Sequence, residues 1–219
     1  MFAFSPNRPE LPASLAASIR PVTMAASRQI SVGAPWSALL PDGGLRRGST
    51  IVINSAAGAG ALSAAFSVVA HPTSKGHWAA LVGVDDPGVV AMAEFGISLA
   101  HVLFLPRPRD AWVEATADLI DGVDLVVVRP PSRPAHGAAR RLMARARERR
   151  AVLLVVSEPR SAWPVPVDVM IDITDADWRT DATLRDRVIT TRISGRGAAR
   201  RGDDARLLLP TTSGTVDRP

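Results

Sequence analysis

The sequence predicts an α/β protein in which a mostly parallel central sheet is covered by helices on both faces and ends in a C-terminal antiparallel hairpin. Three observations predict this class. The chain has 219 residues with 47% hydrophobic content, which is enough for one sizeable core. Apolar runs of strand length alternate with segments of helical pattern, and each run is unbroken, as in parallel strands buried on both faces. Residues 49–70 join such a run to a helical segment through a loop of small residues.

The N-terminal residues 1–40 are rich in proline, alanine and serine, and we expect an arm here. Residues 9–20 predict one short helix that places Leu11, Leu15 and Ile19 on one face. Such a face packs either on a partner or on the chain's own core, and the pattern leaves both possibilities open. A Pro-Asp-Gly-Gly turn at residues 41–44 precedes the first strand.

Residues 41–195 form the predicted core, in which strands and helices alternate along the chain. The predicted strands are the apolar runs at residues 50–53, 78–85, 101–105, 123–128 and 151–156. The predicted helices lie at residues 62–70, 87–99, 110–120 and 135–150, with a loop at residues 71–76. This alternation is typical of a parallel sheet.

The end of the chain changes character. Further strands are predicted at residues 167–174, 187–193 and 205–209, and a loop rich in glycine and arginine, residues 194–202, separates the last two. We expect these strands to close one edge of the sheet as an antiparallel hairpin. Residues 196–219 thus comprise a loop, an edge strand and a tail.

Composition narrows the possible chemistry. Cysteine is absent, which excludes disulfides, thiolate metal sites and a cysteine nucleophile. The four histidines show no spacing suited to a metal, so no metal site is expected. Prolines interrupt the N-terminal residues, which lack the apolar core of a signal peptide, and no run reaches membrane-spanning length. We therefore expect a cytoplasmic protein that does not enter the membrane.

Charge is unevenly distributed along the chain. The net charge is +5, and only one of the 26 basic residues, Lys75, is a lysine. Arginines crowd the predicted helix at residues 135–150, whereas aspartates dominate the stretch after it. The separation fits docking of a charged partner, although a solvated helix face is the simpler interpretation. Trp163 and Trp178 flank the acidic stretch and are candidates either for an exposed interface or for the core.

The loop of small residues has the outline of a phosphate-binding P-loop without its charge. The motif is G-x-x-x-x-G-K-[ST], in which lysine reaches the phosphates and the hydroxyl holds Mg²⁺. Aligned on Gly60, the chain offers Ser55 for the first glycine, Ala61 for the lysine and Leu62 for the hydroxyl residue. Arg129 ends a later apolar strand where a metal-binding carboxylate is needed. We therefore expect no catalytic residues, no metal and no cofactor.

Two other interpretations of this region were weighed. Gly58, Gly60 and Ser63 approach the G-x-G-x-x-G dinucleotide pattern, with Asp85 near the position of a ribose-binding acid. The loop is wider than that pattern requires, so NAD binding stays an alternative. Asp85 and Asp86 could orient a water near a phosphate, but Asp86 as the N-cap of the next helix is the simpler prediction.

The run Leu-Pro-Asp-Gly-Gly-Leu-Arg-Arg-Gly at residues 40–48, followed by a strand and the P-loop-like turn, resembles the start of the ATPase core of RecA-type recombinases. The later strand order is similar over residues 36–195. With Ala61 and Arg129 at the lysine and carboxylate positions, the chain most resembles the degenerate ImuA-type (ImuA-prime) proteins of actinobacteria. The resemblance implies a RecA-like three-layer sandwich and a pseudo-ATPase.

The resemblance further implies an accessory role in damage-induced (SOS) translesion synthesis and mutagenesis. The partner would be an ImuB-like Y-family polymerase homologue and, indirectly, an error-prone DnaE-type polymerase. The protein would then associate with the nucleoid when recruited to damage. We expect partner contact through the helix face at residues 11–19 and the C-terminal edge. The residues that we expect to contact the partner are Leu11, Leu15, Ile19, Arg192, Arg196, Arg200, Arg201, Leu207 and Leu208.

Three alternatives remain open from the sequence. The chain could be a nucleotide-binding enzyme that takes ATP or NAD. It could be a DNA-binding repair accessory that uses the arginines of residues 140–150 or 196–206. A cell-division inhibitor built on a RecA-like fold is a further interaction-protein alternative.

Overall fold

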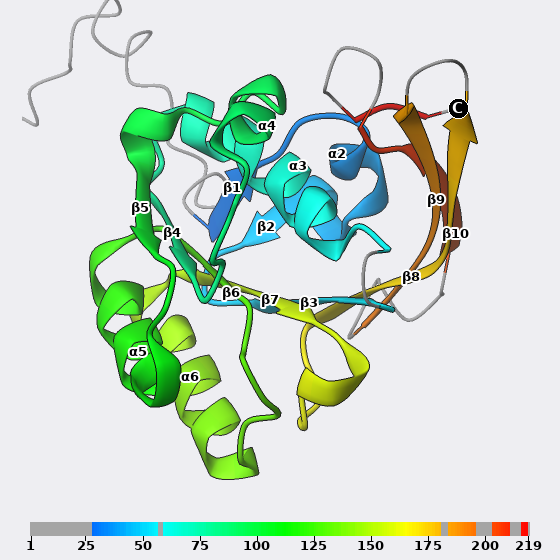
Figure 1. Cartoon of the computed structure of the whole chain (residues 1–219). Helices are drawn as coiled ribbons and strands as arrows, with labels where there is room; N and C mark the ends of the chain where they lie inside the picture. The colour runs from blue at the N-terminus through cyan, green and yellow to red at the C-terminus, as the bar shows by residue number, and fades with distance from the viewer. Residues whose placement is uncertain (1–27, 57–58, 181–183, 196–202, 211–215, 219) are drawn as a thin grey trace, which may run out of the picture.

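The computed structural model of the chain describes residues 28–56, 59–180, 184–195, 203–210 and 216–218 (Figure 1). Within these ranges, eight strands form one sheet in the order β10-β9-β8-β3-β7-β6-β4-β5. Helices lie on both faces of its parallel part (Figure 1). The predicted α/β class, the mostly parallel sheet and the C-terminal antiparallel hairpin are confirmed.

Six strands of this sheet run parallel, with β3 near the centre. They are β3 (Thr50–Ser55), β4 (Ala79–Val82), β5 (Val102–Leu105), β6 (Leu125–Val128), β7 (Val152–Ser157) and β8 (Val169–Thr180). Almost every residue of β3, β4, β6 and β7 is buried, which explains their unbroken apolar sequences. Their carboxyl ends meet at one edge, where the loops that follow them gather.

Two layers of helices cover the sheet. On one face lie α3 (Ala61–Ser74) and α4 (Val89–Glu94), packed with the β3 residues Ile51 and Ile53 in one apolar cluster. On the other face lie α5 (Trp112–Gly122) and α6 (His136–Arg149), in a second cluster around Val52 (Figure 1). Because alternate residues of β3 face opposite clusters, both faces of the central strand are covered.

The described part of the predicted N-terminal arm, residues 28–40, packs on this core. The strand β1 (Gln29–Ser31) pairs antiparallel with β2 (Gly44–Arg46), and α2 (Trp36–Leu39) follows β1. Trp36 is fully buried, and its indole Nε1 donates a 2.8 Å hydrogen bond to the Ser67 hydroxyl of α3. These three elements were not predicted, and the predicted helix at residues 9–20 lies outside the described residues.

Several predicted element boundaries were wrong, among them the end of the strand predicted at residues 167–174, which continues to Thr180, and the ends of two helices. The loop predicted at residues 71–76 is largely helical, because α3 continues through Pro72 to Ser74. The Thr73 hydroxyl donates to the carbonyls of Val69 and Ala70, at 3.0 and 2.9 Å, and supports this last turn. The predicted helix at residues 87–99 is shorter, because Gly96, with φ of 85°, follows the end of α4.

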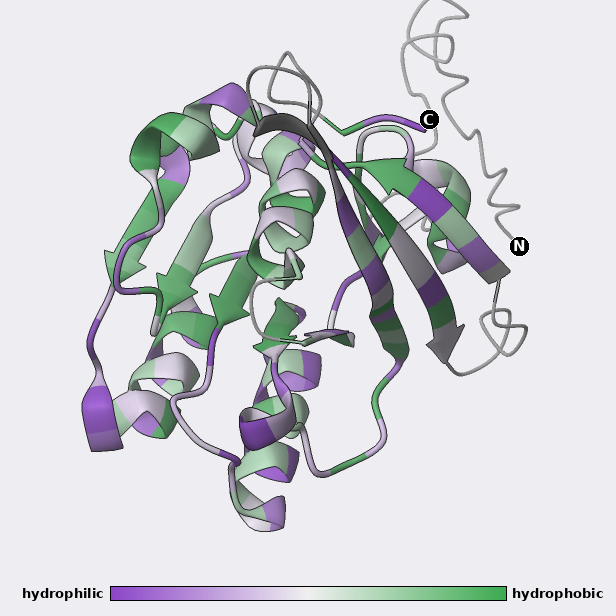
Figure 2. Cartoon of the chain, turned by 45° about the vertical axis from the view of Figure 1, so that its right-hand side comes forward, coloured by the Kyte–Doolittle hydropathy of each residue, from purple (hydrophilic) through white to green (hydrophobic). Residues whose placement is uncertain are grey.

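The hairpin consists of β8, β9 (Leu184–Gly195) and β10 (Asp203–Leu208), which pair antiparallel. β8 pairs with β3 only as far as Ile173, opposite Ser55. Beyond a register shift after Ile173, β8 and β9 continue as a ribbon past the carboxyl edge of the sheet, and β10 pairs with β9 as far as Val188. Figure 2 shows hydrophilic and hydrophobic residues mixed along these strands, in contrast to the hydrophobic parallel strands. Arg187 of β9 lies next to Gly60, which places this ribbon beside the P-loop-like turn.

Two arginines at the end of β2, Arg46 and Arg47, bind carboxylates at the opposite, amino edge of the sheet. Arg46 donates to the buried carboxylate of Asp168 at 2.8 Å, and the second oxygen of Asp168 accepts from the Thr50 backbone N–H at 3.0 Å. Arg47 donates to Asp124 at 2.8 Å. The paired arginines of residues 40–48 thus have a structural role at the ends of β3, β6 and β8.

Candidate functional site

The strand and the helix predicted on either side of the P-loop-like turn (residues 55–62) are present, and residues 57–58 of the turn lie outside the described residues. β3 ends at Ser55 and α3 begins at Ala61, with Gly60 as its N-cap at φ of 99°, a value that favours glycine. Ala61 is buried, and Leu62 packs against the apolar core. Both positions that would hold a phosphate-binding lysine and a Mg²⁺-binding hydroxyl therefore carry apolar side chains.

A guanidinium group from the hairpin lies directly on this turn. A side chain at Gly60 would overlap Nη2 of Arg187, which belongs to β9. Arg187 is 5% exposed and lies 5.0 Å from the ring centroid of Trp178 on β8, a cation–π distance. Burial lowers the pKa of the Arg187 guanidinium, which stays a cation because arginine does not deprotonate in proteins. The residues of the turn carry no charged side chain, so the positive charge beside the turn comes from Arg187 of β9.

The remaining walls of this turn's cavity come from the ends of β6 and β7. The cavity measures about 210 Å³, and Arg129, Glu158 and Arg187 line it together with the turn. Arg129 donates to the Glu158 carboxylate at 2.6 Å. Glu158 is 8% exposed, and its second oxygen lies 3.4 Å from Arg160. Among the described residues that line this cavity, the one carboxylate is therefore held by arginines.

The position of Arg129 and Glu158 bears on metal chemistry. A carboxylate that binds Mg²⁺ needs free oxygen atoms, and the two oxygens of Glu158 already contact Arg129 and Arg160. A metal ion there would also meet the positive charges of both arginines. Over the part of the chain that the structure describes, no group of three or more His, Cys, Asp or Glu residues is placed to hold a metal.

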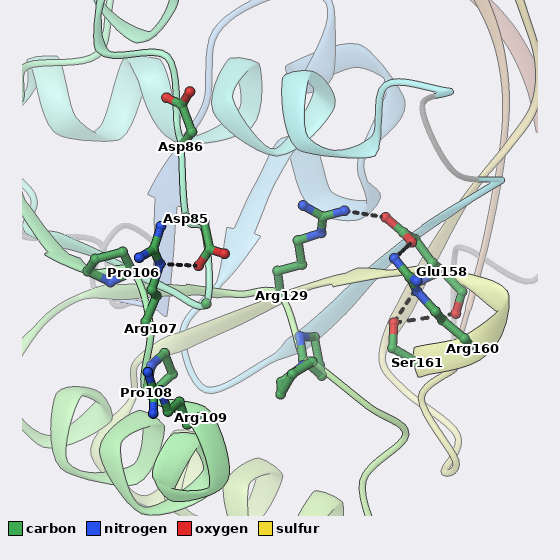
Figure 3. A pocket seen from close by; sticks show the side chains of 13 residues that line it. Asp85, Asp86, Pro106, Arg107, Pro108, Arg109, Arg129, Glu158, Arg160 and Ser161 are labelled. Atoms are coloured by element: carbon green, nitrogen blue, oxygen red, sulfur yellow. Dashed lines mark hydrogen bonds and ion pairs between the residues drawn. The ribbon is translucent and has the colours of Figure 1, made fainter.

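A larger cleft adjoins the first cavity and shares Arg129 and Glu158 with it. We call it the arginine cleft; it measures about 560 Å³ and lies between the loops that follow β4, β5, β6 and β7. Figure 3 shows Asp85 and Arg107 on one side, Glu158 and Arg160 on the other, and Arg129 between them. Its lining mixes basic, acidic and proline residues.

The segment after β4 also corrects a prediction. The N-cap of α4 is Gly88, with φ of 62°, and the prediction of Asp86 in that role is wrong. The Asp86 carboxylate instead accepts a 3.2 Å hydrogen bond from the Gly88 backbone N–H. Asp85 lies 3.7 Å from Arg107 in a pair of two largely exposed side chains. Among the described residues, neither aspartate forms a hydrogen bond or an ion pair with the P-loop-like turn.

Residues 38–165 match the family described as MT3502 N-terminal domain. The chain belongs to this family. It is also 43% identical over 97 residues to Uncharacterized protein Rv3395c of Mycobacterium tuberculosis, a stretch that covers 44% of this chain and 48% of that protein. The chain thus spans about half the length of the curated relative it matches.

The MT3502 N-terminal domain match contains the P-loop-like turn, Arg129, Glu158 and the whole arginine cleft. It ends before β8 and β9, so Arg187 lies outside it. Among the described residues, no helix is long and apolar enough to cross a membrane.

The structure brings together only some of the predicted site residues. Ser55, Gly60, Ala61, Leu62 and Arg129 line one cavity, as the motif alignment requires. Gly58 and the predicted partner residues Leu11, Leu15, Ile19, Arg196, Arg200 and Arg201 lie outside the described residues.

The predicted partner residues of the C-terminal edge have different surroundings. Arg192 is exposed and forms a bidentate pair with Asp204 across β9 and β10, at 2.8 and 3.1 Å. This pairing raises the pKa of Arg192 and lowers that of Asp204. Leu207 is fully buried in the core, and Leu208 is half-buried beside a bridge to Asp217. Arg192 and Leu208 are therefore accessible, whereas Leu207 stabilises the fold.

The arginine-rich helix is partly engaged within the chain. Asp121 of α5 accepts two hydrogen bonds from Arg145, at 2.8 and 2.5 Å, and lies 3.1 Å from Arg149. The hydrogen bond from Arg145 holds the pKa of Asp121 below its usual value. Arg140 and Arg141 are exposed. Part of the charge on α6 therefore fastens it to α5.

Sequence reasoning missed two residues of the site. Glu158 directly follows a predicted buried strand, at the edge where parallel strands place their loops, and this position was a usable signal. Arg187 had no local signal, because strand pairing alone brings β9 beside a turn far away in sequence. Of the two candidate interface tryptophans, Trp163 is buried and Trp178 is 43% exposed.

Proposed function

We propose that this protein is a non-catalytic, RecA-like interaction protein of a translesion-synthesis assembly. It would support damage-induced mutagenesis by binding an ImuB-like polymerase adaptor and, through it, an error-prone DnaE-type polymerase. The single observation that carries the non-catalytic part is the Arg187 guanidinium on Gly60. The polymerase context rests on the resemblance at residues 36–195.

Arg187 supports the absence of nucleotide turnover in two ways. Its guanidinium takes the space next to Gly60, where a P-loop admits a phosphate. It is also fixed by burial and by Trp178, in contrast to a lysine on a flexible stem. Because β9 already holds the buried Arg187 guanidinium next to Gly60, we assign this side chain a role in stabilising the fold.

The Arg129–Glu158 pair supports the same conclusion independently. Phosphoryl transfer needs a metal that neutralises charge on the phosphates, and that metal needs an available carboxylate. Here the carboxylate is engaged by Arg129 at 2.6 Å. The motif positions of the lysine and the Mg²⁺-binding hydroxyl are therefore apolar, and the nearby carboxylate is already engaged.

Nucleotide binding without catalysis is a second candidate, and Arg187 is the observation that favours it. A guanidinium beside a helix N-terminus attracts phosphate if it can move from Gly60. Under this alternative, replacing Arg187 with alanine abolishes ATP binding. Under the first proposal the wild-type protein does not bind ATP.

Co-purification tests the proposed function. The full chain and a tagged ImuB-like adaptor from the same genome are co-expressed, and we expect them to elute together with no ATPase activity beyond that of the adaptor alone. Deleting the gene should lower the frequency of mutations induced by ultraviolet light, and the wild-type chain should restore it. Absence of both effects would reject the proposal.

Surface variants then locate the contact. A truncation after Gly195 is unsuitable because it removes β10 and its buried Leu207. Arg192→Ala with Arg206→Ala tests the C-terminal edge, since both side chains are exposed there. Arg140→Ala with Arg141→Ala on α6 removes the same charge elsewhere and is the matched control. Equal retention by the two double variants would remove the C-terminal edge from the proposal.

A further inference from the structure

The arginine cleft is a second recessed site, which adjoins the cavity of the P-loop-like turn and shares Arg129 and Glu158 with it. Its volume of about 560 Å³ lies within the usual range of ligand-binding pockets. It lies at the carboxyl ends of parallel strands, which is where open α/β sheets bind their ligands. We propose that this cleft binds an extended acidic segment of a partner protein, with carboxylate side chains on its arginines.

Four arginines surround the cleft against three carboxylates, which leaves one net positive charge. Arg107 and Arg160 belong to opposite walls, and their side chains are 72% and 77% exposed (Figure 3). Both have most of their donors in solvent, although each already contacts a carboxylate of the chain. A guanidinium binds a carboxylate with two parallel hydrogen bonds, so exposed arginines on two walls can hold two acidic side chains.

The contacts within the cleft already model this chemistry. Arg107 lies 3.7 Å from Asp85, a long pair between exposed groups that an incoming carboxylate can replace at little cost. Arg129 is different, because it is held at 2.6 Å by the buried Glu158. Arg107 can therefore exchange its carboxylate partner for one of a ligand, whereas Arg129 keeps its contact with Glu158.

Backbone geometry adds a further observation. Arg109 lines the cleft from the Pro106-Arg107-Pro108-Arg109 segment and has φ of 50°, in the left-handed region that side chains other than glycine seldom adopt. Strain of this kind persists where the surrounding structure imposes it and is concentrated at functional sites. The prolines on either side of Arg107 fix the path of the segment that carries it.

A peptide fits this lining better than a phosphate ligand or a nucleic acid. Phosphates are commonly bound by clusters of backbone N–H groups, and Pro106, Pro108, Pro130 and Pro131 in the cleft have none. A continuous phosphate backbone would also face the three carboxylates of the lining. A peptide can place neutral residues opposite these carboxylates and apolar side chains on the proline rings.

This inference deepens the proposed function by naming the chemistry of a partner segment, and its test needs no polymerase protein. Fluorescence anisotropy of the full-length chain is measured with a labelled peptide of alternating Glu and Ala, at about 150 mM salt to screen diffuse attraction. A peptide with Gln in place of Glu, a single-stranded oligodeoxynucleotide and pyrophosphate are the comparison probes. We expect the Glu peptide to bind and the Gln peptide not to bind.

The variants separate the cleft from general basicity. Arg107→Gln/Arg109→Gln/Arg160→Gln should weaken Glu-peptide binding about tenfold, since three contacts are lost. Arg140→Gln/Arg141→Gln/Arg147→Gln on α6 removes equal charge from exposed positions and should change it less than about twofold.

Asp85→Asn provides a second variant in the opposite direction, because it releases Arg107 and should tighten binding. Circular dichroism verifies that each variant folds. Equal weakening by both triple variants, preferred binding of the oligonucleotide or pyrophosphate in the cleft, or no peptide binding at millimolar concentration would each overturn the inference. If the adaptor co-purifies but one of these results is found, the proposed function stands and the cleft inference fails. If the Glu peptide binds the cleft but the adaptor does not co-purify, the cleft inference stands and the proposed function fails.

Discussion

Replacing Gly60 with alanine tests the contact between the P-loop-like turn and Arg187. The backbone at Gly60 has φ of 99°, and an added methyl group would overlap Arg187 Nη2. A left-handed backbone costs an alanine about 1–2 kcal/mol. Displacing Arg187 costs about 1–2 kcal/mol more through its packing and its cation–π contact with Trp178. We expect Gly60→Ala to destabilise the fold by about 3 kcal/mol.

Gly76 is a matched control for the backbone term alone. It also has a positive φ, of 88°, but no atom lies within 4 Å of the position of an added methyl group. Gly76→Ala should therefore cost only about 1–2 kcal/mol. For a chain of this size, the Tm of Gly60→Ala should be about 2–8 °C below that of Gly76→Ala, and urea denaturation should report the same ranking.

A double-mutant cycle identifies Arg187 as the source of the difference. In an Arg187→Ala background the overlap is gone, and Gly60→Ala should cost no more than Gly76→Ala. The reasoning is refuted if Gly60→Ala and Gly76→Ala are equally costly in the wild-type background. It is equally refuted if Arg187→Ala leaves the cost of Gly60→Ala unchanged.

Three further predictions concern the sheet edges and the turn. Asp168→Ala should destabilise the fold by about 3 kcal/mol in urea denaturation, because it leaves the buried Thr50 N–H without its acceptor, and Arg46→Ala should cost less. Burial acts to raise the pKa of Asp124, but hydrogen bonds, among them that from Arg47, outweigh it and lower the pKa. The stabilisation from Asp124 is therefore complete above about pH 4 and is lost as the pH falls through the lowered pKa, and Asp124→Asn should flatten this part of the stability profile. Ala61→Lys with Leu62→Thr restores the lysine and hydroxyl positions of the motif, yet calorimetry should show no ATP binding while Arg129 stays paired with the Glu158 carboxylate.

The parallel core was predictable because its strands are buried on both faces. The sequences of β3, β6 and β7 are therefore apolar throughout, and each is followed by a helix or a turn signal. The prediction was wrong where a local signal was overridden. Pro72 suggested the end of α3, but the helix continues to Ser74, and in this last turn the Thr73 hydroxyl donates to the carbonyls of Val69 and Ala70.

The N-terminal part of the fold carried too little local information. β1 and β2 have three residues each, too few for a periodic pattern, and they pair across a connection that includes α2. Trp36 is buried through its contact with Ser67 on α3, which no pattern near Trp36 reveals. Residues 28–46 therefore needed the tertiary structure for their assignment.

The sequence alone could show that the motif's lysine and carboxylate positions carry other residues, but not which side chain lies on the turn in their place. Ala61 and Arg129 could be identified as departures from a linear motif. Arg187 reaches Gly60 only because β8 and β9 extend beyond the end of β3, a consequence of strand length and pairing. The sequence thus indicated an uncharged loop, and the structure reveals a turn occupied by a buried arginine.

A calorimetric titration of the full-length wild-type chain with ATP in the presence of Mg²⁺ tests the central claim most directly. Because Arg187 lies on Gly60 and Arg129 engages Glu158, we predict no heat beyond dilution up to millimolar ATP. Saturable binding with a micromolar Kd that requires Mg²⁺ would contradict the claim that this turn has lost its nucleotide chemistry.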